Sequence, residues 1–104
     1  MNNIYKRLNV GNDRISEMSD GDLNFLSSSS EDVIYSITKG LSALGNLTHA
    51  ATNSEEYSQD DAMTDLEKIA QILPVLSLII EAEYENHFNV IMEKQKRRQI
   101  KKEN

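Results

Sequence analysis

The stretch LEKIAQILPVLSLIIEAEYENHFNVI, residues 66–91, decides the fold of this chain. Apolar side chains recur in it three and four residues apart, which is the spacing of one face of an α-helix. The recurring positions are Leu66, Ile69, Leu73, Leu76, Ile80, Tyr84, His87 and Ile91. Because this heptad-like spacing is sustained along the whole stretch, we interpret the eight residues as a face that binds another helix.

Between Ile69 and Ile80 the same stretch is apolar around nearly all of the helix circumference. A helix that is apolar on every side is normally buried, and one neighbouring helix cannot cover it. Pro74 lies within this segment. Proline removes one backbone hydrogen bond and crowds the preceding turn, which predicts a kink or a break. The sequence therefore predicts a long, kinked helix that self-association or a partner completes.

A second apolar stripe precedes the deciding stretch and predicts a shorter helix. Ser28 and Glu31 match a capping box, which places the start of this helix near residue 31. A polar connector at residues 55–59 follows, and Ser58 or Asp60 can cap the next helix. A connector this short makes the two helices antiparallel. The stripe itself consists of Val33, Ile37, Leu41, Leu44, Leu47 and Ala51.

We therefore predict an all-α fold, an antiparallel helical hairpin over residues 31–93. Residues 1–30 contain turn-forming Gly, Asn and Asp residues and four consecutive serines, which predict an irregular N-terminal arm with short helical turns. Residues 94–104 form a basic C-terminal tail. A chain of 104 residues is one small domain with a modest core, so a partner would add appreciably to its stability.

Charge is distributed unevenly along the chain. The net charge is −6, but six basic residues and no acid occupy residues 94–102. These are Lys94, Lys96, Arg97, Arg98, Lys101 and Lys102. Such a cluster can contact phosphates or an acidic protein surface. Alternatively, the cluster only places cations favourably at the C-terminus of a helix and keeps the protein soluble. The acidic remainder of the chain would be repelled by nucleic acid.

Several functional classes find no support in the sequence. There is no cysteine, and His49 and His87 fall on different predicted helices, so we expect no metal site. No phosphate-binding glycine loop or nucleophile motif is present, and we expect no enzyme activity, cofactor or small-molecule substrate. The longest apolar stretch is too short to span a membrane, and the N-terminus lacks a signal-peptide core. We expect a cytoplasmic protein that does not bind membranes.

The segment GLSALGNLTHAA (residues 40–51), the acidic connector and residues 66–83 together resemble small prophage-type helical-hairpin proteins of unassigned function. This resemblance implies a mobile-element accessory protein that binds and inhibits or regulates a host protein or complex. Our leading interpretation is a protein–protein interaction module whose partner is another protein, a second copy of the chain, or both. The alternative is a nucleic-acid-associated protein that uses the basic tail.

Overall fold

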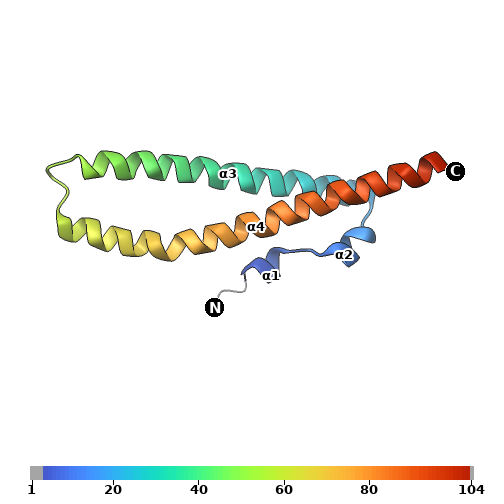
Figure 1. Cartoon of the computed structure of the whole chain (residues 1–104), viewed down its shortest axis with the longest axis horizontal. Coiled ribbons are helices and arrows are strands. Elements are labelled where there is room, and N and C mark those ends of the chain that lie inside the picture. The colour runs from blue at the N-terminus through green and yellow to red at the C-terminus, as the bar shows by residue number, and fades with distance from the viewer. Residues whose placement is uncertain (1–3, 104) are drawn as a thin grey trace.

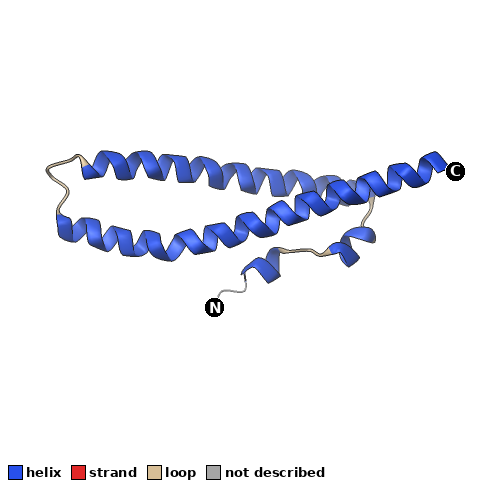
Figure 2. Ribbon diagram, in the orientation of Figure 1, coloured by secondary structure: helices blue, strands red, loops and turns tan. Residues whose placement is uncertain are grey.

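The computed structural model describes residues 4–103, in which every secondary-structure element is a helix and no strand occurs (Figure 2). The elements are α1 (Ile4–Leu8), α2 (Asn12–Ser16), α3 (Asp20–Thr52) and α4 (Gln59–Glu103). The prediction of an all-α fold is confirmed. Residues 1–3 of the predicted arm and residue 104 of the predicted tail lie outside the described residues.

The two long helices, α3 and α4, lie side by side and run in opposite directions (Figure 1). The short helices α1 and α2 contact α4 and not the connector end of the molecule (Figure 1). The whole chain measures 69 × 27 × 16 Å. Since a helix with its side chains is about 10–12 Å across, this is an elongated plate between one and two helices thick.

Helix α3 begins earlier than the sequence predicted. Ser19 is its N-cap, and the backbone N–H of Asp22 donates to Ser19 Oγ at 3.1 Å. Asp20 and Asp22 place negative charge in the first turn, where the helix dipole favours it. The predicted capping box at Ser28 and the irregular course of residues 20–30 are therefore wrong. Local propensity disfavours four serines in a helix, but contacts with α4 stabilise them there.

Helix α4 begins where the sequence predicted and then continues for 45 residues. The backbone N–H of Asp61 donates to Ser58 Oγ at 3.0 Å, which caps the first turn. Pro74 lies inside the helix and does not end it, so the break that was one of the expected outcomes is absent. Ala70 and Pro74 are both exposed, so water can reach the carbonyl that proline leaves without a donor. The described part of the basic tail is helical as well.

The hydrophobic core occupies only one end of the plate. Ile15 from α2, Leu23 from α3 and Val90 from α4 are fully buried and form one cluster, against which Val10, Met18 and Leu26 pack. No residue between positions 31 and 81 is buried. Burying a large aliphatic side chain contributes about 1.5–3 kcal/mol, so this small cluster accounts for much of what stabilises a domain of this size. The half of the plate near the connector has no comparable core.

Candidate interaction surface

A line of large apolar side chains lies exposed along α4. Tyr84 keeps 64% of its surface accessible, Phe88 52% and Leu66 50%. Successive members are three, four or seven residues apart, which places them on one side of the helix. We call this line the α4 stripe; it comprises the exposed Leu66, Leu73, Tyr84, Phe88 and Ile91 together with the half-buried Ile80. A continuous exposed apolar line of this kind is characteristic of a surface that binds another protein.

The eight residues of the predicted interaction face divide between this stripe and the boundary with α3. Leu66, Leu73, Tyr84 and Ile91 are exposed, whereas Ile69, Leu76, Ile80 and His87 are half-buried. Leu66, Ile69 and Leu73 face α3 across a hollow of about 480 Å³, which α3 lines from Leu41 to Thr52. The N-terminal part of the predicted face therefore lies beside α3, and four of its eight side chains are exposed.

A second hollow lies beside the middle of α4. Its volume is about 620 Å³. Tyr5 of α1 lines it together with residues from positions 80–88 of α4. The Tyr5 hydroxyl donates a hydrogen bond to the Glu85 carboxylate, which raises the pKa of Tyr5. This bond holds α1 against α4 at the edge of the hollow. The lining from α4 consists of Ile80, Glu81, Tyr84, Glu85 and Phe88.

Buried polar side chains fix the rotation of α4 about its own axis. They therefore determine which face of the helix stays exposed. Asn86 is 1% exposed; its Nδ2 donates to the Leu8 carbonyl at 2.8 Å, and its Oδ1 accepts from the Val10 N–H at 2.8 Å. Asn86 Nδ2 also donates to Glu83 Oε1 at 2.9 Å, and the buried Ser30 hydroxyl donates to the same oxygen at 3.1 Å. One polar network therefore joins the N-terminal arm, α3 and α4.

His87 belongs to a second polar link between the two long helices. Its Nδ1 lies 2.8 Å from the Ser27 hydroxyl, and its Nε2 lies 3.4 Å from a Glu31 carboxylate oxygen. Both partners belong to α3. His87 was predicted as a member of the interaction face, and it is engaged here within the chain. Rotation of α4 that brought His87 outward would break both contacts, so the link favours the present orientation of the α4 stripe.

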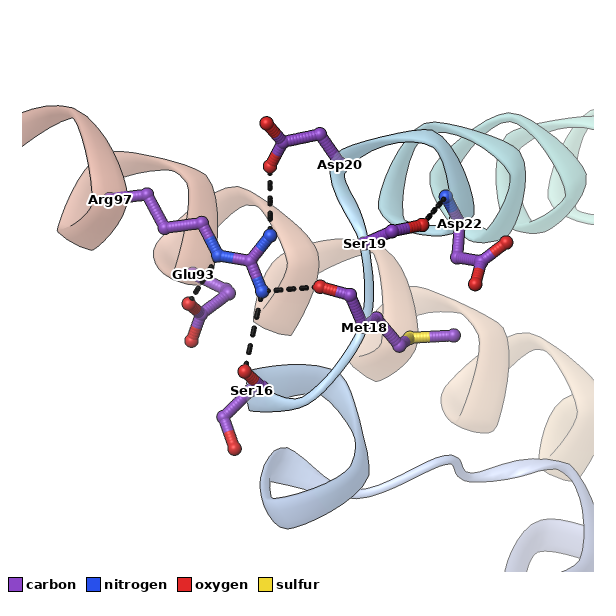
Figure 3. Close-up of polar contacts among 7 residues, drawn as sticks. All are labelled: Ser16, Met18, Ser19, Asp20, Asp22, Glu93 and Arg97. Atoms are coloured by element: carbon purple, nitrogen blue, oxygen red, sulfur yellow. Dashed lines mark hydrogen bonds and ion pairs between the residues drawn. The ribbon is translucent and has the colours of Figure 1, made fainter.

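Arg97 connects the basic end of α4 to the N-terminal segments (Figure 3). Its guanidinium donates to Asp20 Oδ1 and to Glu93 Oε2, each at 2.8 Å, and the hydrogen bond to Asp20, followed by that to Glu93, raises the pKa of Arg97. It also donates to the carbonyls of Met18 at 2.6 Å and Ser16 at 3.3 Å. All of these contacts lie where α2 leads into α3. Arg97 is therefore engaged within the fold, and its role as a polyanion or acidic-partner contact stays a prediction.

The other basic residues of the predicted contact are free of such bonds in the described part of the chain. Lys96, Arg98, Lys101 and Lys102 are exposed, and Lys94 is half-buried. They occupy the last three turns of α4, where their charge also suits the helix dipole. The basic helix end therefore carries five residues without such bonds, and Arg97, which has them.

Residues 4–103 contain no group of three or more His, Asp or Glu side chains placed to hold a metal ion. None of the helices in the same range combines the length and the apolar character needed to cross a bilayer. Comparison of the chain with family models, with curated proteins and with solved structures gives no match.

Sequence reasoning missed the residues that hold this surface in place. Asn86 occurs between Ala82 and Val90 at helical spacing, and both of these neighbours are buried. That spacing is the one signal that could have identified Asn86 as a core residue. Ser30 and Arg97 carry no comparable signal for their contacts with Glu83 and Asp20, because those partners lie 53 and 77 residues away in the chain.

Proposed function

We propose that this chain is a protein–protein interaction module and that the α4 stripe is its docking surface. The observation that carries the proposal is the exposure of Tyr84 and Phe88, at 64% and 52%, on a helix whose opposite side is fixed by buried contacts. Aromatic side chains dominate the binding energy of many protein interfaces. In this proposal the two long helices act as a hairpin, bent at Pro74, that a partner completes.

The acidic character of the chain bears on the choice of partner. With a net charge of −6, the protein attracts basic surfaces over distances of about a Debye length. Inhibition or regulation of a host protein would be one use of such a module. In the same proposal the protein acts without catalysis and in the cytoplasm.

Paired aromatic-to-serine variants test the docking surface. The test variant combines Tyr84→Ser and Phe88→Ser on α4, and the matched control combines Tyr35→Ser and Phe25→Ser on α3. The control tyrosine is as accessible as Tyr84, at 62%, and the control phenylalanine is more accessible than Phe88, at 75%. Both tagged variants, and the unchanged chain, are used to capture proteins from cells that express the natural protein. We expect the α4 variant to lose a captured protein, whether a different protein or another copy of the chain, that the control retains. Equal recovery by all three forms would refute the proposal.

A second candidate function rests on the basic helix end. Lys96, Arg98, Lys101 and Lys102 are exposed within two turns, a density typical of phosphate contact. Nucleic-acid binding would weaken with salt, and each lost phosphate contact would lower the slope of log affinity against log salt by about 0.9. A variant with glutamine at these four positions should then bind more weakly and with a shallower slope. An unchanged slope would exclude this function.

A further inference from the structure

The hollow of about 620 Å³ beside the middle of α4 is lined by aromatic rings and carboxylates together. Tyr5 approaches it from α1, and Tyr84 and Phe88 lie four residues apart on one side of α4. The two carboxylates are those of Glu81 and Glu85, which are also four residues apart and line the same hollow. One ligand in this hollow therefore meets both aromatic faces and negative charge.

Both carboxylates can accept further hydrogen bonds. Glu81 is exposed, and its side chain forms no hydrogen bond or ion pair to another residue within positions 4–103. Glu85 accepts from the Tyr5 hydroxyl, but a carboxylate has about four lone-pair positions, so it has room for other donors. The hydrogen bond to Glu85 is the main cause of the raised pKa of Tyr5, and the charges of Glu85 and Glu81 act in the same direction. Both carboxylates therefore lie near the Tyr5 hydroxyl.

The part of α4 beside the hollow carries acids and no bases. Between Lys68 and Lys94 the chain has four glutamates and neither lysine nor arginine. Lys6 and Arg7 follow Tyr5 in α1, but both are exposed and neither lines the hollow. Within the two segments that line the hollow, negative charge therefore exceeds positive charge, which favours a cationic ligand.

The exposed tyrosine of α3 makes a contact that the Tyr84 ring lacks. The Lys39 ammonium lies 4.8 Å from the centroid of the Tyr35 ring. This is within the distance of about 6 Å at which a cation is attracted to an aromatic face. Tyr84 is about as accessible as Tyr35, at 64% against 62%, and no cation lies over its ring in the part of the chain from 4 to 103. The face of Tyr84 is therefore open to a cation from another molecule.

We propose that this hollow binds an arginine side chain of a protein partner, with the guanidinium against the rings of Tyr84 and Phe88 and its N–H groups toward Glu81. This inference rests on the proposed function, because it names the chemistry of the partner at the same docking surface. Arginine suits the lining better than lysine does. Its planar guanidinium stacks on aromatic faces and can donate to one carboxylate through two parallel N–H groups.

A short arginine peptide tests this recognition without the natural partner. The probe is N-acetyl-Gly-Arg-Gly-amide, and the control is the same peptide with citrulline, which has the shape of arginine without its charge. Each is titrated into the isotopically labelled full chain, and the amide resonances are followed by NMR. We expect the arginine peptide to shift the amides of Tyr5 and residues 80–88, and the citrulline peptide to shift them far less. Equal shifts from both peptides, no shift at millimolar concentration, or shifts confined to the acidic turn at Asp60 and Asp61 would each overturn the proposal.

Two variants distinguish an arginine site from a purely apolar one. Tyr84→Leu combined with Phe88→Leu keeps apolar side chains but removes both aromatic faces, and should weaken binding of the arginine peptide about tenfold. Glu81→Gln keeps the shape and removes one charge, and should weaken binding about threefold. The matched controls are the exposed Phe25→Leu and Glu67→Gln, which lie outside the hollow and should leave binding unchanged. Circular dichroism checks that each variant stays helical. Undiminished binding by both hollow variants would overturn the proposal.

The inference and the proposed function fail in different ways. A captured protein that is lost from the Tyr84→Ser, Phe88→Ser variant, but binds equally well to the leucine variant and to Glu81→Gln, would show an apolar docking surface. That result overturns the arginine contact and leaves the proposed function standing. If the serine variant captures the same proteins as the unchanged chain, both are overturned. A captured protein that needs both aromatic rings and the Glu81 carboxylate supports both.

Discussion

Replacement of Asn86 by leucine should destabilise the fold although leucine is more hydrophobic and of similar size. Asn86 is 1% exposed and makes three hydrogen bonds, to Leu8, Val10 and Glu83. A hydrogen bond contributes about 0.5–1.5 kcal/mol net, and a buried group that loses its partner costs about 1–3 kcal/mol. Leu8 and Val10 remain partly accessible, so water can replace some of what is lost. We expect the free energy of unfolding to fall by about 2–3 kcal/mol.

Urea unfolding followed by circular dichroism measures this change. With an m-value of about 1.5 kcal/mol/M, the midpoint of Asn86→Leu should fall by about 1–2 M. Because self-association would make stability depend on concentration, all proteins are compared at one concentration. Asn89→Ala is the control, since Asn89 lies three residues after Asn86 and its side chain makes no hydrogen bond to another residue within positions 4–103. Its midpoint should stay close to that of the unchanged chain. Equal midpoints for the two variants would refute the view that Asn86 anchors the N-terminal arm to α4.

Three further predictions follow from single contacts. Arg97→Ala should speed amide exchange and tryptic cleavage in the N-terminal segments, because it removes the link to the α2–α3 junction, whereas Arg98→Ala should leave both unchanged. Leu23→Ala should lower the free energy of unfolding by about 2–4 kcal/mol, whereas Phe25→Ala, being exposed, should change it by less than about 0.5 kcal/mol; similar values for both would contradict the assigned core. The raised pKa of Tyr5 means that its neutral form is favoured in the folded state, so its contribution to stability is present below pH 10 and is lost as the pH rises through the higher folded pKa. An ultraviolet titration should therefore lose one late-titrating tyrosine in Tyr5→Phe.

The sequence alone determined the helical class of the protein and several of its boundaries. Helical spacing of apolar residues is a local property, so the stripes after Val33 and after Leu66 predicted helices that the structure contains. The cap at Ser58 could also be read locally, because its hydrogen bond spans only three residues. The exposed line of large side chains on α4 was visible as a pattern, though its exposure was not.

Tertiary contacts alone decided which polar residues join distant segments of the chain. From the local sequence, Ser30 belongs to a serine run, Asn86 is a polar residue within an apolar stretch, and Arg97 is part of a basic tail. Their hydrogen bonds to Glu83, Val10 and Asp20 span 53, 76 and 77 residues, so no local pattern could reveal these contacts. A buried polar group is stable only where a partner meets it, and the packing of distant segments supplies that partner. These same contacts set the rotation of α4, so its exposed face became visible only in the folded chain.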